Sequence, residues 1–147
     1  MRTKLTRSMS IPIPLLPRWL RYLGVGTVAV VLLYFSVLTT PPVTPPEPDP
    51  LWDKKLHFAG YAALTLALAY ATAQIRPRRR RVAAVVGVAI AYGLVIEVLQ
   101  LPQPTRYFSL LDGLANAIGV VLASAWFLVE PRLRYVAVGG TDTPSES

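Results

Sequence analysis

The stretch VAAVVGVAIAYGLVIEVLQL, from Val82 to Leu101, decides how this chain folds. Glu97 is its one charged residue, the arginine-rich segment RPRRRR precedes it, and PQP follows it. A helix of about 20 mostly apolar residues is long enough to cross the hydrocarbon core of a bilayer. The stretch therefore predicts a transmembrane helix with a basic start and a proline stop.

Three more apolar runs of similar length flank this one, at Tyr22 to Leu38, His57 to Ile75 and Leu110 to Val129. The composition agrees, since 53% of the 147 residues are hydrophobic and 16% are charged, against about 25% charged in soluble domains. The sequence therefore predicts an all-α integral membrane bundle of four transmembrane helices, and it excludes a soluble enzyme.

The rest of the chain divides around these four runs. The predicted parts are a basic N-terminal segment at 1–21, a proline-rich outer linker at 39–50, a core at 51–130 that holds the last three runs, and a cytoplasmic tail at 131–147. The linker ends in Asp49-Pro50, which is typical of a helix start with aspartate as N-cap. A cleaved signal peptide is the alternative for the first run, but no small-x-small cleavage site follows Leu38.

The lysines and arginines predict the orientation. If the N-terminus is inside the cell, 12 of the 15 lie on the cytoplasmic side, including the five arginines of 76–81. Cytoplasmic loops carry this excess of lysine and arginine, so we expect both termini in the cytoplasm and a multi-pass protein of the plasma membrane. The arginine run is then interpreted as a topology anchor near lipid head groups, and nucleic acid is not an expected partner.

Polar side chains interrupt the apolar runs at matching depths. They are Asp53, Lys54 and His57 at the second run, Glu97 and Gln100 in the third, Arg106 in the outer loop, and Asp112 and Asn116 in the fourth. Helical rise places His57, Glu97 and Asp112 roughly 22 to 27 Å from the inner boundary of a core about 30 Å thick. Ionisable residues inside a membrane usually face a partner or a wet cavity, so we expect one polar pocket open to the outer face.

Helical spacing supports a shared pocket. Asp112, Asn116, Gly119 and Ala123 fall in one stripe of the fourth run, and polar and small residues on one face favour helix contact. Small residues also recur at 59, 63, 67 and 71 and at 83, 87 and 91. The sequence predicts that the last three helices form the core and that the first lies at its edge.

Structural roles compete with functional ones at these positions. Ser109 and Asp112 fit a capping box, and Asp53 also suits a helix N-terminus. Glu97 lies too far along its helix to cap it, and its plain role is an ion pair with Arg106, Lys54 or Lys55. A structural polar lock and an active site both remain open.

The polar positions resemble the motifs of the VanZ-like membrane proteins. The chain carries three blocks in order: Asp53-Lys54 with His57-Phe58 and Gly60-Tyr61, then Gly93, Glu97 and Gln100, then Arg106, Ser109, Asp112, Ala115, Asn116 and Gly119. The resemblance covers Asp53 to Gly119. It implies a cell-envelope role and supplies no reaction. The family takes its name from a protein associated with low-level teicoplanin resistance, a property that does not transfer with the resemblance.

Two classes of function follow for the pocket. In the first, the eight polar residues bind an anionic or lipid-linked envelope ligand, such as a membrane lipid or lipid-linked glycan, or a partner protein, and Arg106 recognises phosphate or carboxylate. In the second, an intramembrane hydrolase or transferase acts on an envelope lipid or glycan at the outer leaflet. Its candidate catalytic residues are Glu97 or Asp112 as general base and His57 as proton carrier. No serine or cysteine nucleophile motif is present.

Metal chemistry is limited by a single histidine and no cysteine. A site with several histidines within one chain is excluded, although His57 with carboxylates and an asparagine has donors for a divalent cation. The sequence analysis assigns no metal and no cofactor.

Overall fold

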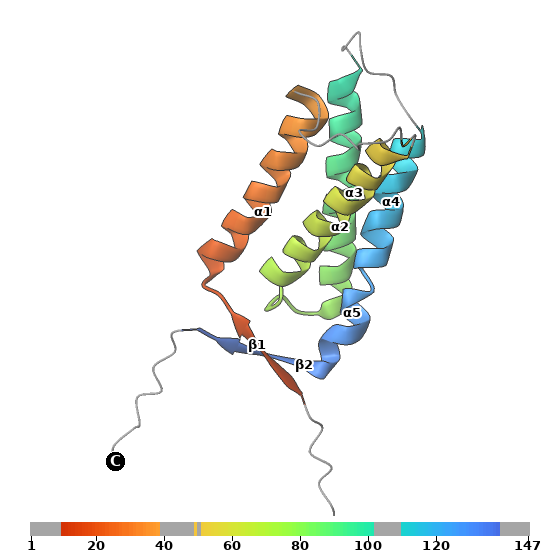
Figure 1. Cartoon of the computed structure of the whole chain (residues 1–147). Coiled ribbons are helices and arrows are strands. Elements are labelled where there is room, and N and C mark those ends of the chain that lie inside the picture. Colours follow the sequence, from red (N-terminus) through yellow and green to blue (C-terminus); the bar gives the residue numbers. More distant parts are fainter. Residues whose placement is uncertain (1–9, 39–48, 50, 102–109, 139–147) are drawn as a thin grey trace, which may run out of the picture.

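The computed structural model describes residues 10–38, 49, 51–101 and 110–138. Four helices pack along one another, and a pair of short strands closes one end of the bundle (Figure 1). The elements are β1 (Ile11–Leu15), α1 (Arg18–Leu33), a π-helical turn (Tyr34–Leu38), α2 (Trp52–Ala71), α3 (Arg78–Gln100), α4 (Leu110–Ala123), α5 (Trp126–Val129), a 3-10 turn (Glu130–Arg132) and β2 (Leu133–Ala137).

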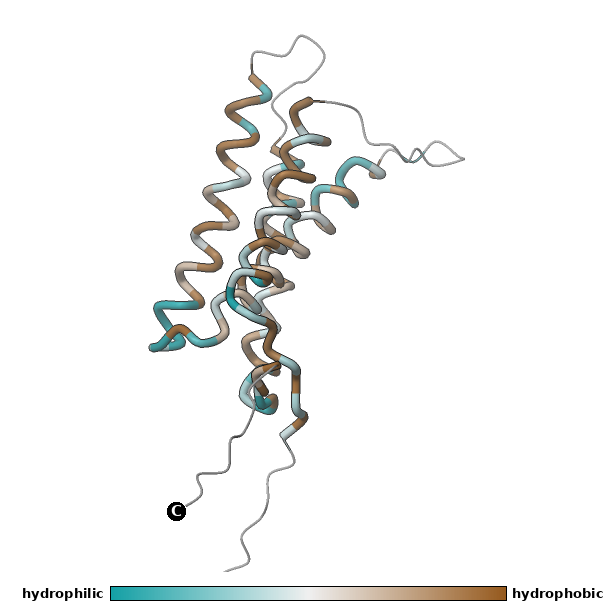
Figure 2. Tube along the Cα trace, turned by 90° about the vertical axis from the view of Figure 1, so that its left-hand side faces the viewer, coloured by the Kyte–Doolittle hydropathy of each residue, from teal (hydrophilic) through white to brown (hydrophobic). Residues whose placement is uncertain are grey.

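Three helical segments in the described part of the chain are long and apolar enough to cross a membrane: Arg18–Leu38, Arg78–Gln100 and Leu110–Arg132. Figure 2 shows apolar residues along most of the helices, with hydrophilic residues gathered near the helix ends. Large apolar side chains are open on the outside, such as Leu110 at 77% and Leu128 at 74% exposure. Contiguous apolar surface of this kind marks an interaction site, and here it suits a lipid environment.

The fourth expected span, α2, does not belong to this group. Its first turn contains Asp53, Lys54 and Lys55, so its apolar part is shorter than the helix. It is also the central helix, with seven buried residues: His57, Tyr61, Leu64, Thr65, Leu68, Ala69 and Ala71. Because α1, α3 and α4 all pack on it, α2 needs less lipid-facing surface than its neighbours.

The buried core joins α2 to the helices that follow it. Its members are Tyr61, Leu64, Leu68 and Ala69 of α2, Val85 and Ala89 of α3, Val120 of α4 and Phe127 of α5. The first helix contributes partly buried side chains against this cluster, including Val25 and Leu32. This agrees with the predicted core of the last three helices and an edge position for the first.

The small residues play two different parts. On α4 the predicted stripe is correct, since Asn116 and Gly119 are buried. A Cβ on Gly119 would overlap the carbonyl oxygen of Phe58 in α2. On α3 the prediction is wrong, because Ala83, Gly87 and Ala91 are exposed. In a bilayer alanine and glycine are tolerated on outer faces too, so spacing alone does not identify the contact face.

On α2 the predicted stripe holds only in its second half. Ala59 and Ala63 are exposed, Ala67 is half-buried and Ala71 is buried.

The two strands are an addition to the expected all-α fold. β1 pairs in parallel with β2, from Ile11 opposite Leu133 to Leu15 opposite Ala137. In a parallel strand, every second residue forms its backbone hydrogen bonds with the same neighbouring strand. The carbonyl of Leu15 accepts a hydrogen bond from the N–H of Val138, next to β2, so the odd-numbered residues of β1 bond to β2. Pro12 and Pro14 therefore face the outer edge, where a missing N–H discourages further pairing. Residues 11–15 and 133–137 thus lie together at one end of the bundle.

A buried ion pair lies at this same end. Arg81 is 1% exposed, and its guanidinium donates to both carboxylate oxygens of Glu130 at 2.9 and 2.7 Å. The Tyr135 hydroxyl donates to Glu130 at 2.8 Å. Burial, together with this hydrogen bond, raises the pKa of Tyr135 to about 12. The interpretation of 76–81 as a simple surface anchor is therefore wrong for Arg81, which joins α3 to the C-terminal segment.

Arg21 has a similar internal role. Its guanidinium is buried and donates to the carbonyl of Ala71 and the side chain of Gln74, both at 2.9 Å. It thereby satisfies carbonyl groups at the C-terminal end of α2, which a helix end otherwise leaves without partners.

The start of α2 is two residues later than the sequence suggested. The helix begins at Trp52, and Pro50 lies outside the described residues. Asp49 still organises this start, because its carboxylate accepts from the backbone N–H of Leu51 at 2.9 Å. A hydrogen bond from Lys55 lowers the pKa of Asp49, with help from the Leu51 N–H.

Candidate functional site

The helix ends that carry the polar motifs lie at the end of the bundle opposite β1 and β2 (Figure 1). This follows from the alternating directions of the helices. The first turns of α2 and α4 and the last turns of α3 all lie at that end, and these turns carry the polar motifs. The sequence expectation that three helices share one polar layer is met by this arrangement.

Lys54 lies between two carboxylates from different helices. Its ammonium is 3.2 Å from Asp53 Oδ2 and forms a very close ion pair with Asp112 Oδ1. The side chain of Asp112 is 13% exposed and that of Asp53 is 49% exposed. Asp112 lies in the first turn of α4, and Ser109, the other half of the suggested capping box, is outside the described residues. The ion pair between Lys54 and Asp112 links α2 to the start of α4, and it does so whether or not Asp112 also caps α4.

His57 connects the same two helices one turn further in. It is 6% exposed, and its Nδ1 lies 3.0 Å from Asn116 Oδ1. If Nδ1 carries the proton, it donates to this amide oxygen, and Nε2 is left with a lone pair. Nε2 lies 3.9 Å from Asp53 Oδ2. The backbones are close enough for these contacts because Gly119 allows α4 to approach Phe58 and Ala62.

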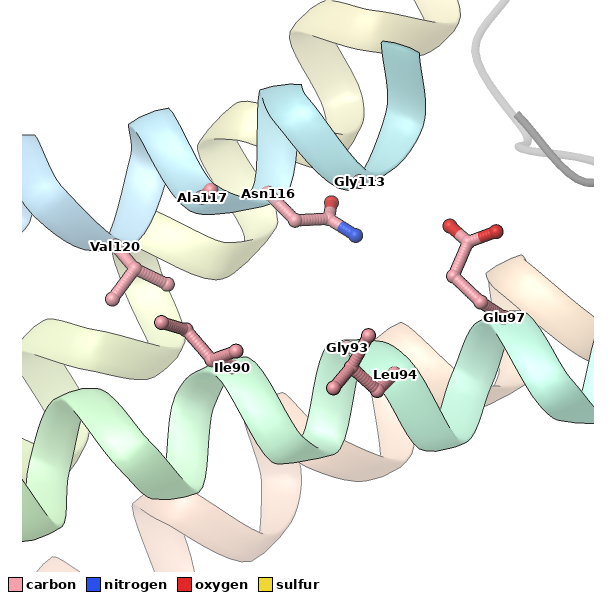
Figure 3. A pocket seen from close by; sticks show the side chains of 8 residues that line it. All are labelled: Ile90, Gly93, Leu94, Glu97, Gly113, Asn116, Ala117 and Val120. Atoms are coloured by element: carbon pink, nitrogen blue, oxygen red, sulfur yellow. The ribbon is translucent and has the colours of Figure 1, made fainter. Parts of the chain in front are cut away.

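Glu97 lines a small cavity between α3 and α4. The cavity has a volume of about 50 Å³ and is bordered by Ile90, Gly93, Leu94, Glu97, Gly113, Asn116, Ala117 and Val120. Figure 3 shows the Glu97 carboxylate and the Asn116 amide turned toward the same gap. Glu97 is 5% exposed, and its Oε1 has no hydrogen-bond partner among the described residues. A buried polar atom of this kind costs free energy unless something binds it.

Gln100 lies on the same side of α3 but has a different partner. It is buried, and its Nε2 donates to the carbonyl oxygen of Ser36 at 2.6 Å. Ser36 belongs to the π-helical turn at the end of α1, where a widened turn frees backbone groups. The contact ties α1 to α3 beside the pocket.

The structure thus brings together six of the eight predicted site residues in direct contacts or one shared cavity: Asp53, Lys54, His57, Glu97, Asp112 and Asn116. Gln100 is next to them on α3, and Arg106 lies outside the described residues. Two residues were missed as neighbours of the site, Ser36 and Tyr61.

Tyr61 is fully buried and its hydroxyl has no hydrogen-bond partner within the described residues. Its ring packs against Gly93, where an added Cβ would lie 3.1 Å from Cε1. Its position four residues after His57 was the available signal, because that spacing puts both on one face of α2.

Three donor atoms in this site are close enough to attract a metal ion. Ligand atoms of Asp53, His57 and Asp112 all lie within 4.8 Å of one another. The residues include two carboxylates and one imidazole, a set that suits divalent ions taking mixed oxygen and nitrogen ligands.

Comparison with known proteins adds no identification. No family model, no curated protein and no solved structure matches the chain.

Proposed function

We propose that this chain is a VanZ-like multi-pass protein of the plasma membrane whose outward pocket binds the polar head group of an envelope lipid or lipid-linked glycan. All four long helices cross the bilayer in this proposal, with α2 shielded at the centre. Both termini are cytoplasmic, which agrees with the charge bias and with the pairing of β1 and β2 at one end of the bundle.

The single observation that carries the proposal is a Glu97 carboxylate oxygen that has no partner among the described residues, in a residue 5% exposed. A buried acceptor of this kind is satisfied by a ligand hydroxyl or amine. The cavity of about 50 Å³ admits one small polar group between α3 and α4, so the rest of the ligand stays at the membrane surface. Lys54, and Arg106 from the sequence motif, are the cationic groups for an anionic part of the same ligand.

The convergence of the three motif blocks supports the same conclusion. Residues from positions 53–57, 97 and 112–116 meet in space although the chain separates them widely. The Lys54–Asp112 and His57–Asn116 contacts hold the pocket walls together. A structural lock needs these two contacts, but it does not need the Glu97 cavity.

Native mass spectrometry of the purified protein in mild detergent tests this proposal. We expect one lipid or lipid-linked molecule to remain bound to each wild-type chain. Glu97→Gln should retain at least about tenfold less, because a hydrogen bond to a charged group contributes about 1.5–3 kcal/mol. Asp49→Asn is the matched control, since it removes a carboxylate at the same end of the bundle but outside the pocket.

Equal lipid retention in wild type and Glu97→Gln, with both proteins folded, would contradict the ligand site. Retention of a protein in place of a lipid would assign the pocket to a partner protein. Loss of folded Glu97→Gln protein would favour the structural lock.

A second candidate, hydrolysis or group transfer at the outer leaflet, is favoured by the surroundings of His57. Its two ring nitrogens face Asn116 and Asp53, and a carboxylate or amide that orients an imidazole is a common feature of proton-transfer sites. Incubation with extracted envelope lipids tests it. Head-group release by wild type, lost in His57→Gln, would establish a reaction, and no release over many hours would exclude this candidate for those lipids.

A further inference from the structure

The cluster formed by Asp53, His57 and Asp112 lies within the proposed pocket and has the composition of a metal site. Two carboxylates supply the negative charge that balances a divalent ion, and the imidazole adds a nitrogen ligand. Their donor atoms lie within 4.8 Å of one another. Three ligands around one ion at about 2.0–2.2 Å lie roughly 3.3–3.8 Å from one another, so the donor atoms have to move together by about 1 Å or more to bind one ion.

The hydrogen bond of His57 prepares it for this role. Metal-binding histidines usually donate their second ring N–H to an oxygen acceptor, which fixes the tautomer and the ring orientation. Nδ1 of His57 faces Asn116 Oδ1 at 3.0 Å. The other nitrogen, Nε2, is the one that faces Asp53.

The Lys54 ammonium occupies the place that a bound cation would take. Its ammonium lies between Asp53 and Asp112 and contacts both, which is where a cation held by those carboxylates would lie. The Lys54 side chain is 25% exposed, and its flexible stem allows the ammonium to move toward water. A bound ion and the Lys54 ammonium would therefore compete for the same two carboxylates.

Glu97 is the second, independent sign of a ligand. Its side chain is buried, with 5% exposure, and its Oε1 has no hydrogen-bond partner in the described part of the chain. Figure 3 shows its carboxylate directed at α4 near Gly113 and Asn116. Gly113 directly follows the proposed ligand Asp112 in the sequence. The described pocket residues thus include three carboxyl groups, and the Lys54 ammonium pairs with two of them, Asp53 and Asp112. This set of oxygen donors suits a cation.

We propose that Asp53, His57 and Asp112 bind one divalent cation of the Zn²⁺ or Mn²⁺ class, with Asn116 orienting His57 and Lys54 as the competing charge. This inference rests on the proposed pocket and deepens it. Asn116 contacts His57 and also lines the Glu97 cavity, so an ion held by the three residues would lie next to that cavity and could contact an anionic head group bound there.

Electron paramagnetic resonance with Mn²⁺ tests the site directly. The full chain is purified in detergent with an affinity tag that contains no histidine and is titrated with Mn²⁺. Because His57 is the one histidine, an imidazole nitrogen coupling on bound Mn²⁺ identifies this residue without any variant. We expect one Mn²⁺ per chain with that coupling, and displacement of Mn²⁺ by Zn²⁺.

Variants then separate the ligands from their surroundings. Asp112→Asn and Asn116→Ala should lower the affinity by at least about tenfold, the usual size of effect for a lost ligand or ligand-orienting group. Lys54→Met should raise the affinity because it removes the competing ammonium. Asp49→Asn, whose carboxylate pairs with Lys55 outside the cluster, should leave the affinity unchanged.

Bound Mn²⁺ without imidazole coupling, or no stoichiometric binding of either ion, would overturn the metal site. An affinity unchanged in Asp112→Asn would do the same. Lipid retention is measured separately, in the presence of a chelator. Retained lipid without metal binding refutes the metal site alone, and metal binding without retained lipid refutes the proposed ligand alone.

Discussion

Replacing Gly119 by alanine tests whether the close approach of α4 to α2 sets the geometry of the polar pocket. An added Cβ would overlap the carbonyl oxygen of Phe58 and lie 3.2 Å from Phe58 C and 3.3 Å from Ala62 N. All three atoms belong to the backbone of α2, so no side chain can swing away. The two helices have to move apart.

The expected size of the effect combines two opposing terms. Overpacking of a tight contact costs about 1–3 kcal/mol, while alanine in place of glycine within a helix gains about 0.5–1 kcal/mol. The net loss for Gly119→Ala is therefore about 0–2.5 kcal/mol, near the upper part of that range because the clash is with backbone atoms. Gly87→Ala is the matched control, because an added Cβ there meets no atom of the structurally described residues within 4 Å. It should gain about 0.5–1 kcal/mol.

Unfolding of both variants in detergent micelles, followed by helical circular dichroism during titration with a denaturing detergent, measures this difference. Gly119 lies three residues after Asn116, so separation of the helices should also lengthen the His57–Asn116 hydrogen bond and lower lipid retention. A Gly119→Ala protein as stable as Gly87→Ala, with unchanged retention, would refute the argument that this contact positions the pocket.

Three more predictions address orientation, stability and the outer loop. A reporter fused after Ser147 should be active on the cytoplasmic side, and one inserted within 39–50 should be active on the outer side. An externally active reporter after Ser147 would contradict the four-span topology. Glu130→Gln should lower the free energy of unfolding by about 3–5 kcal/mol, because it leaves the buried Arg81 charge without its partner; stability within 0.5 kcal/mol of wild type would show that water compensates Arg81, and the same detergent titration measures it. Arg106→Lys should fold normally but lose most lipid retention in mass spectrometry, since lysine keeps the charge and loses the bidentate fork; full retention would assign Arg106 to simple charge balance.

The polar pocket was predictable because its members obey helical spacing. Glu97 and Asp112 stand out from apolar runs at matching depth, and the alternating directions of successive helices bring such positions together. The partners within the pocket were not predictable from spacing. The pairing of Lys54 with Asp112 and of His57 with Asn116 depends on the rotation of α2 about its axis.

The end of the bundle that contains Arg81, β1 and β2 was harder to predict from the sequence. Arg81 belongs to a run of arginines that topology alone explains, and only its depth beside Phe127 and Glu130 distinguishes it from its exposed neighbours. The strands were missed because IPIPL and LRYVA are short and lie at opposite ends of the chain. A pairing between such distant segments leaves no local pattern to detect.

The pairing of β1 with β2 has a consequence for biosynthesis. Ile11 leaves the ribosome before any helix of the bundle, while its partner Leu133 is translated only after all of them. Chains fold from the N-terminus onward during synthesis, so β1 waits beside the membrane with its partner edge open until the last helix is inserted. Closure of this ladder is therefore a late step of assembly, and a chain truncated before Leu133 would enter the bilayer without it, leaving an exposed strand within reach of quality-control proteases.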